Sequence, residues 1–153
     1  MNLSNRPRKT LRSDAGRMVE TCAAWNSRLA ARRITQFLDA ALAETGFGAA
    51  QLGLMAQIAA ADDDTLGALA RRSGLEQSTL SRNLRTLERE GLIEIATVES
   101  DLRRRAVWLT ETGARRLEAA IPVWRKAQTR LAKVLNAGLA QRLAKGTEAL
   151  AAE

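Results

Sequence analysis

The sequence predicts a mainly α-helical protein that also contains one small two-stranded β-sheet. Of its 153 residues, 46% are hydrophobic, 27% are charged and 3% are aromatic. Alanine, leucine and arginine are frequent, and all three favour helix over strand. Leucines recur at helical spacing in several segments, whereas residues 92–98 and 107–109 alternate with the period of a strand. These observations together give the fold class.

Two short helices are expected between residues 65 and 90. The first begins at Thr65, a suitable N-cap, and ends at Ser73, where Gly74 can adopt the left-handed conformation that terminates a helix. The second covers residues 77–90 and starts three or four residues later, which is the spacing of a helix-turn-helix. The residues expected to face the core are Leu66, Leu69 and Ala70 in the first helix and Leu80, Leu84 and Leu87 in the second.

The other face of the second helix carries hydroxyl and guanidinium groups. It holds three arginines and no acid, while Glu88 and Glu90 project sideways. Arginine can pair with guanine through two hydrogen bonds and serine can donate or accept one, so the face suits a DNA major groove. A solvated surface is the alternative interpretation, but the helix-turn-helix context favours DNA. The face consists of Ser78, Arg82, Arg85 and Arg89, with Ser81 beside them.

A β-hairpin is expected after Gly91. Residues 92–98 and 107–109 would form its strands, and Glu99–Arg105 would form a charged loop at its tip. A helix-turn-helix followed by such a hairpin is a winged helix-turn-helix. An arginine at the tip can enter the minor groove, and Asp101 would orient a neighbouring guanidinium by a charge-assisted hydrogen bond. An ordinary surface hairpin is the alternative.

These segments resemble the MarR family of bacterial transcription regulators. The resemblance combines L-x-x-L-A in the first helix, STLSRNLRTLEREGLIE in the second, and the wing pattern D-x-R-x-x-x-V-x-L-T-x-x-G, which here runs from Asp101 to Gly113. The wing pattern is the specific part, because a helix-turn-helix alone is common. The resemblance extends from about Ala15 to the C-terminus. It implies a homodimer that binds double-stranded DNA at a pseudo-palindromic operator.

The resemblance also implies which residues contact DNA. By the resemblance, residues 78–89 would be the recognition helix. Within the leading hypothesis, we expect Arg82 and Ser78 to read base edges and the other arginines to contact phosphates. Arg103 matches the wing arginine that reaches the minor groove, and Asp101 matches the acid that supports it. The tip is richer in arginine than the family pattern, so which guanidinium enters the groove stays open. The full set of candidates is Gln77, Ser78, Ser81, Arg82, Arg85, Arg89, Arg71, Arg72, Asp101, Arg103 and Arg104.

The composition of the whole chain limits its function. A net charge of +7 fits a polyanionic partner, either nucleic acid or an anionic membrane surface, and the placement of the arginines favours DNA. No stretch approaches the ~18 apolar residues of a membrane span and no apolar signal core is present, so we expect a cytoplasmic protein. With no His, one Cys, no phosphate loop and no paired carboxylates, we expect no metal, no cofactor and no enzymatic activity.

A single MarR-type domain is expected to span residues 1–153. Residues 1–13 would be a flexible basic arm, either tracking phosphates or simply disordered, and residues 61–110 the winged helix-turn-helix. Residues 14–60 and 111–153 would be dimerisation helices. Their apolar residues occupy more than one stripe and therefore need a partner subunit as well as the core. We expect one helix from residues 14–18 to Glu44, a second over residues 49–60, and a third from Thr110 to Leu135 that Pro122 bends or interrupts.

Regulation by a small molecule is expected from the resemblance, because MarR-like proteins hold effectors between the dimerisation helices and the winged domain. An anionic aromatic compound would suit a guanidinium beside tryptophans. Each Trp has an alternative role as a core residue. Cys22 has two interpretations: burial as an inert thiol on an apolar helix face, or redox sensing through an accessible thiolate. The candidate effector residues are Trp25, Asn26, Arg33, Trp108 and Trp124.

The leading hypothesis is a homodimeric, ligand-responsive, sequence-specific regulator, acting as a repressor that its effector releases from the operator. A thiol-based redox sensor using Cys22 is the first alternative. An architectural protein that coats DNA without sequence preference is the second. An enzyme is the least favoured class, for the absences given above.

Overall fold

The computed structural model describes residues 9–136 and 138–152. The chain divides into two compact units, one up to Phe37 and one from Leu38 onward. No helix among the described residues is long and apolar enough to cross a membrane. The architecture is the predicted one, mainly helical with a two-stranded antiparallel sheet. Its elements are α1 (Lys9–Thr21), α2 (Ala23–Leu42), η2 (Ala43–Thr45), α3 (Ala49–Ala59), α4 (Leu66–Ser73), α5 (Gln77–Arg89), β1 (Ile93–Val98), β2 (Asp101–Leu109), α6 (Glu111–Leu131), α7 (Leu139–Gly146) and η3 (Glu148–Ala152).

The N-terminal unit is helical from Lys9, whereas a helix was predicted to begin only at residues 14–18. Residues 9–13 of the predicted flexible arm therefore belong to α1, and residues 1–8 lie outside the described part. No proline follows Pro7 in this region, and Asp14 pairs with Arg17 one turn along the helix, which is compatible with an early start. The predicted single helix is interrupted at Cys22.

The interruption at Cys22 preserves helical hydrogen bonding on both sides. The amide of Cys22 donates to the carbonyl of Met18 at 2.9 Å, and the amide of Asn26 donates to the carbonyl of Cys22 at 3.0 Å. The side-chain amide of Asn26 also donates to the carbonyls of Glu20 (3.1 Å) and Cys22 (2.9 Å). Asn26 thus supplies local hydrogen bonds where the helix is irregular.

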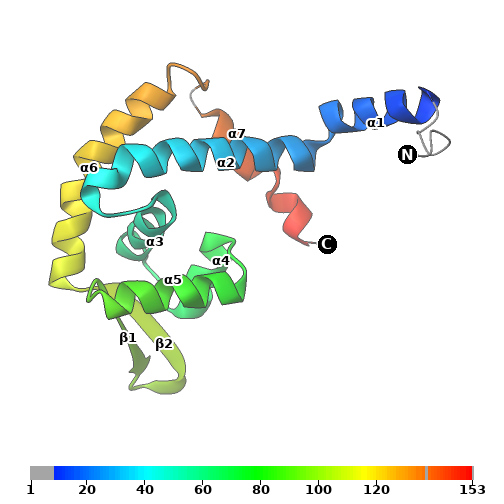
Figure 1. Cartoon of the computed structure of the whole chain (residues 1–153). Helices are drawn as coiled ribbons and strands as arrows, with labels where there is room; N and C mark the ends of the chain where they lie inside the picture. Colours follow the sequence, from blue (N-terminus) through cyan, green and yellow to red (C-terminus); the bar gives the residue numbers. More distant parts are fainter. Residues whose placement is uncertain (1–8, 137, 153) are drawn as a thin grey trace, which may run out of the picture. The chain divides into compact units, whose positions relative to one another are not determined.

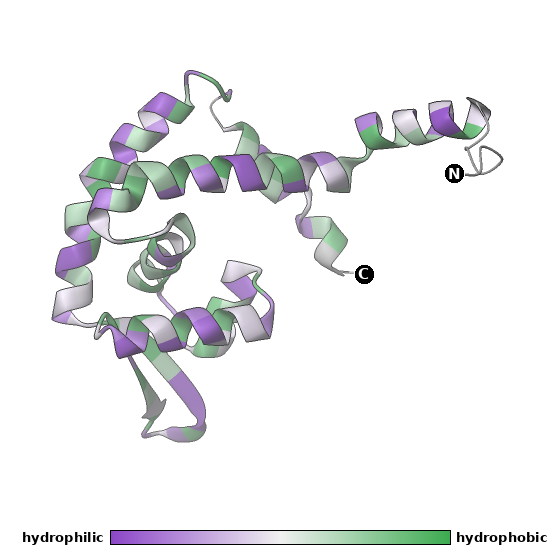
Figure 2. Cartoon of the chain, in the orientation of Figure 1, coloured by the Kyte–Doolittle hydropathy of each residue, from purple (hydrophilic) through white to green (hydrophobic). Residues whose placement is uncertain are grey.

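The core of the second unit lies among α3, α4, α5, α6 and the hairpin, where α3 packs against α4, α6 and β2 (Figure 1). No polar or charged residue is buried among those described. In Figure 2, α5 alternates hydrophilic and hydrophobic bands, as expected for a helix with one buried face. The core includes all three predicted leucines of α5 and also Leu42, Met55, Leu69, Leu92, Ile93 and Val107.

The caps of the second unit match those expected. Thr65 Oγ accepts a hydrogen bond from the amide of Ala68, and Gly74 has the left-handed conformation after α4. Thr110 Oγ accepts from the amide of Gly113 at 3.0 Å and donates to the carbonyl of Gly91 at 2.6 Å. This hydroxyl therefore joins the start of α6 to the end of the recognition-helix region.

The hairpin is longer than predicted. Residues 101–105 were expected in a charged loop, but β2 begins at Asp101 and the connection is reduced to Glu99 and Ser100. Three consecutive arginines do not alternate with apolar residues, so the sequence pattern did not predict a strand there. A strand that is exposed to water can nevertheless contain them. A register irregularity separates Thr97 from Val98.

The segment before α4 forms an isolated β-bridge with β2. Thr65 forms a bridge with Ala106, and the amide of Val107 donates to the carbonyl of Asp64 at 2.8 Å. Main-chain hydrogen bonds thus attach the hairpin to the start of the helix-turn-helix.

The C-terminal helices differ from the prediction at one end. α6 continues through Pro122, with a bend visible in Figure 1, but it ends at Leu131, so Val134 and Leu135 lie beyond it. Pro122 removes one amide donor without ending the helix. Gly138 is left-handed immediately before α7. The sequence Asn136-Ala137-Gly138 predicts a break before a last helix, and Ala137 lies outside the described residues.

Candidate nucleic-acid interface

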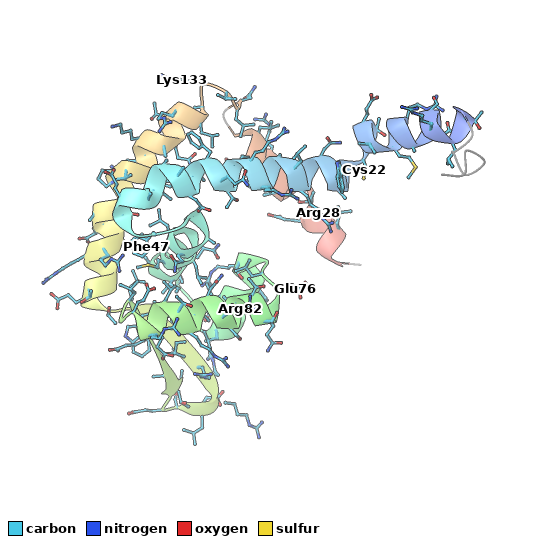
Figure 3. All side chains as sticks on the ribbon, viewed as in Figure 1. Cys22, Arg28, Phe47, Glu76, Arg82 and Lys133 are labelled. Atoms are coloured by element: carbon cyan, nitrogen blue, oxygen red, sulfur yellow. The ribbon has the colours of Figure 1, made fainter. Side chains whose placement is uncertain are left out.

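α5, the predicted recognition helix, separates an anchoring face from a free face. Leu80, Leu84 and Leu87 are buried in the core. Arg82 lies along α5, with Glu76 immediately before the first turn (Figure 3). Every predicted contact residue on α5 is exposed. An open concave surface of about 450 Å³ is lined by Ser78, Ser81, Arg82, Arg85, Thr86 and Arg89.

The positive side of this surface continues onto the last turn of α4. Arg71 and Arg72 are both exposed there. Arg72 Nη1 donates to the main-chain carbonyl of Asp63 at 3.1 Å, so this guanidinium also has a contact within the protein. Arg71 lies close enough to Asp63 to affect its ionisation. Both guanidinium groups therefore lie near Asp63 while remaining exposed to a phosphate.

The wing presents three consecutive arginines on β2, and Arg103, Arg104 and Arg105 are all exposed. Together with Thr65, Leu66 and Gly67 they line an open cavity of about 310 Å³. Asp101 was predicted to orient a guanidinium. Instead its Oδ1 accepts from the main-chain amide of Arg103 at 3.1 Å. Because Asp101 lies beside the tight connection at the end of β1, its carboxylate reaches the backbone two residues ahead and stabilises the turn.

Arg105 is a candidate that the sequence analysis did not select. It lies with Arg85, Ser81 and Glu88 around a crevice of about 260 Å³ between α5 and the hairpin. Side chains alternate along a strand, so Arg105 shares a face with the buried Val107. Applied to residues 101–109, this alternation would have placed Arg103 and Arg105 together on the face of Val107, but only the folded hairpin shows that Arg105 is the one beside α5.

Asp63 organises the entry to α4. Three acidic residues, 62–64, precede α4, where negative charge favours the helix dipole. The structure gives Asp63 a more specific role, because its Oδ1 accepts from Thr65 Oγ at 2.7 Å and from the Thr65 amide at 2.9 Å. These two hydrogen bonds lower the pKa of Asp63, and Arg104 and Arg71 lower it further by charge attraction, while partial desolvation opposes them.

The predicted effector residues belong to both units, and the two in the second unit line different cavities. Trp124 lines a cavity of about 550 Å³ in the second unit. Trp108 is on β2, where its Nε1 donates to Glu94 Oε2 at 3.1 Å on the paired strand. Trp25, Asn26 and Arg33 are exposed residues of the N-terminal unit. The cavity is lined by Leu38, Leu42, Ala49, Leu52, Gly53, Ala56, Ala59, Ala60, Leu117, Ile121, Trp124 and Arg125.

The sequence analysis missed most of this lining, including its one charged residue, Arg125. The small side chains of Gly53 and Ala56 on α3 leave this cavity open. In the sequence these residues did not indicate a cavity, because both also occur in ordinary helices. Arg116 lies next to this region. Its guanidinium is 4.4 Å from the centre of the Phe47 ring, and its Nη2 donates to the carbonyl of Thr45 at 3.3 Å.

Cys22 is exposed, which contradicts the interpretation as a buried thiol. It lies at the junction of α1 and α2 (Figure 3), where no other described element of its unit covers it. Among the described residues, no group of three or more Cys, Asp or Glu side chains could hold a metal ion.

Comparison with known proteins identifies the family. The family model described as the MarR family matches residues 45–104. The crystal structure of the M. tuberculosis transcriptional regulator MosR in complex with DNA is 32% identical, covers 86% of this chain and 97% of that chain, and has a TM-score of 0.76. No curated protein matches the chain.

More distant structures share the fold. The S. aureus MepR–DNA complex is 23% identical, with coverage of 86% and 98% and a TM-score of 0.67. The Streptomyces coelicolor regulator PcaV, in complex with its natural ligand, is 20% identical, with coverage of 85% and 96% and a TM-score of 0.72. The similarity to MosR over nearly its whole length, together with the family match across the helix-turn-helix and wing, assigns the chain to the MarR family of DNA-binding transcription regulators, which are not enzymes.

Proposed function

We propose that this chain acts as a homodimeric, sequence-specific repressor that a small anionic effector releases from its operator. The exposed arginine and serine face of α5, held in place by three buried leucines, is the observation that carries this proposal. A rigid helix whose free face holds several guanidinium groups and no acid is suited to the edges of base pairs. The net charge of +7 adds attraction to the phosphate backbone.

Two classes of contact follow from positions on α5. Ser78 and Arg82 are near the start and middle of the helix and would read base edges, with Gln77 and Ser81 assisting. Arg85, Arg89 and the α4 residue Arg71 would bind phosphates, which position the protein without specifying a sequence. Arg103 and Arg104 would follow the minor groove from the wing.

Replacing Arg82 and Arg89 separately tests this division. Arg82→Ala should weaken operator binding by ~1–3 kcal/mol and relax selectivity at one position of the site. Arg89→Ala should weaken operator and random DNA alike and reduce the slope of log K against log salt by about one. Fluorescence anisotropy over a salt series, on a site selected from random sequences, measures both effects. Identical behaviour of the two variants on operator and random DNA would contradict the assignment.

The same selection separates the repressor from an architectural protein. A chain that coats DNA would enrich no sequence and would protect random DNA uniformly in a footprint. A regulator should enrich a pseudo-palindrome whose half-sites lie about 34–36 Å apart, or a multiple of this, because each copy of a dimer reads one half-site.

Dimerisation is supported by apolar side chains left exposed on both terminal regions. An isolated chain would be expected to cover such residues, and a two-fold partner is the economical way to do so. These exposed residues are Leu11, Met18, Val19 and Trp25 near the N-terminus and Val134, Leu139, Leu143 and Leu150 near the C-terminus.

The cavity beside Trp124 supports a small-molecule effector. Its lining is almost entirely aliphatic or aromatic, and Arg125 is its one cation. A pocket of this type fits a hydrophobic molecule with a single negative charge, since burying a lone carboxylate requires a paired cation. A protein of the same fold, PcaV, binds a natural ligand.

Exchange of Arg125 tests the charge preference of the effector. In the wild type, 2-naphthoate should raise Tm more than the uncharged 2-naphthamide does. Arg125→Met should remove about 1–2 kcal/mol of the preference for the carboxylate and leave naphthamide binding unchanged. Thermal shift and isothermal titration measure the two ligands side by side. Equal loss of both ligands, or no loss of either, would contradict a charge-pairing role.

Redox control through Cys22 is the second candidate, and the exposure of this thiol is the observation that favours it. In that case peroxide should abolish DNA binding of the wild type, and Cys22→Ser should retain binding under the same treatment. An effect of peroxide that persists in Cys22→Ser would exclude this mechanism.

A further inference from the structure

The crevice between α5 and the hairpin adjoins the free face of α5. Figure 1 shows the hairpin beside α5, and the two are in contact through β1. Ser81 and Arg85 line the crevice and also the concave surface on the free face, so the two openings share one edge of the helix. Positions 81, 85 and 88 follow a single row along α5, because residues four and three apart lie above one another on a helix.

Two guanidinium groups and one carboxylate line the crevice. Arg85 and Glu88 come from α5, and Arg105 comes from β2. In the part of the chain that the structure describes, none of these three side chains forms a hydrogen bond or an ion pair. By contrast, the guanidinium groups of Arg72 and Arg116 donate to main-chain carbonyls. The crevice therefore carries one more positive than negative charge, and the fold uses neither of its guanidinium groups.

Apolar side chains line the rest of the crevice. Leu84 is buried in the core, and Leu66 and Ile95 pack against that core. Apolar neighbours keep water away from charged groups and lower the local dielectric constant, so an ion pair is stronger there than in open solvent. An anion in the crevice would therefore be bound more tightly than at an arginine on a flat surface.

We infer that Arg85 and Arg105 together bind one phosphate of the operator backbone, with the Ser81 hydroxyl as a further donor. The inference rests on the proposed function and adds Arg105 to its DNA contacts. With α5 in a major groove and the wing tip in the adjacent minor groove, the backbone that separates the two grooves must cross the junction of α5 and the hairpin. The crevice lies at this junction.

The chemistry of the crevice matches a phosphodiester. This group carries one negative charge, which equals the excess positive charge left after Glu88 offsets one guanidinium. Its two unesterified oxygens can each accept from a different guanidinium, and charge-assisted hydrogen bonds of this kind are strong. Because Arg85 belongs to α5 and Arg105 to the wing, one phosphate would hold both elements in a fixed position on the duplex.

A double-mutant cycle on the full-length chain tests whether the two arginines share a phosphate. Arg85→Ala and Arg105→Ala should each weaken binding to operator and random DNA about five- to tenfold, because a phosphate carries no sequence information. The double variant should lose much less than the product of these factors, and its salt slope should fall by only about one per protomer.

The matched pair combines Arg89→Ala with Arg105→Ala. Arg89 is on the free face of α5 but does not line the crevice. The losses of these two variants should therefore multiply, and the slope of the double variant should fall by about two per protomer. Anisotropy over a salt series measures every variant, and an unchanged Tm establishes that each one is folded. Losses that multiply in the Arg85→Ala and Arg105→Ala pair as well would overturn the inference.

Methylphosphonate substitution identifies the phosphate, because it replaces one charged oxygen by a methyl group at one operator position at a time. One position should weaken binding of the wild type, and Arg85→Ala and Arg105→Ala should both lose sensitivity at that same position. Loss of sensitivity at two different positions would overturn the inference. Operator binding by Arg105→Ala equal to that of the wild type would overturn it too, and would leave the proposed function intact. A wild type that selects no DNA sequence would remove both.

Discussion

Gly113→Ala is expected to lower the free energy of unfolding by about 3 kcal/mol, among the largest effects of any single methyl group in this protein. A Cβ at position 113 would lie 2.9 Å from the carbonyl carbon of Leu92 and closer still to its oxygen. The neighbour cannot easily move. Leu92 is fully buried, and its carbonyl accepts a hydrogen bond from the amide of Thr110 at 3.0 Å.

Urea denaturation followed by circular dichroism measures this effect, and Gly53→Ala is the matched control. Gly53 is also in a helix, but a Cβ there would meet nothing within 4 Å. The control should therefore be neutral or gain ~0.5–1 kcal/mol, as expected when alanine replaces a helical glycine. If Gly113→Ala and Gly53→Ala unfold at the same urea concentration, the close approach of α6 to Leu92 is not a constraint on the fold.

Leu87→Ala is expected to cost ~2–5 kcal/mol of stability, because it removes a fully buried side chain and leaves a cavity under the recognition helix. Arg85→Ala, two residues earlier on the exposed face, should change stability by less than ~0.5 kcal/mol and should instead weaken DNA binding. The comparison separates the residues that stabilise the position of α5 from the residues on α5 that contact DNA.

The two variants are measured by urea denaturation and by anisotropy on the selected operator, below the temperature at which Leu87→Ala begins to unfold. The expected pattern is reciprocal, with stability lost in one variant and affinity in the other. A large loss of stability in Arg85→Ala would mean that its guanidinium supports the fold, and the assignment of the free face of α5 would then have to be abandoned.

Local signals made much of the fold predictable. Thr65 and Thr110 are caps because a β-hydroxyl reaches the third amide of its own helix, and this geometry needs no distant residue. The leucines of α5 are buried at the spacing of one helix face, which is again a property of the local sequence. The exposed face follows from the same periodicity, so the positions of its arginines were predictable as well.

Features that depend on distant or competing contacts were not predictable. Arginines carry no strand pattern, so the extent of β2 and the direction of Arg105 appear only when β1 pairs with it. The cavity draws on helices far apart in the chain, and the alanine and glycine that open it resemble those of any helix. Asp101 binds a backbone amide and not a guanidinium because the connection at the hairpin end is tighter than a run of charged residues suggests.

The strand-like pairing of Thr65 and Asp64 with β2 has a consequence for regulation. Main-chain bonds fasten the hairpin to the first turn of the helix-turn-helix, and the leucines fasten α5 to the same core. Residues 64–110 are therefore expected to move as one rigid body, so that the wing keeps its position relative to the recognition helix. An effector has little scope to loosen one part of this body. It would instead have to move residues 64–110 together with the parts of α3 and α6 that pack against them, and so change the spacing that two recognition helices offer to a duplex.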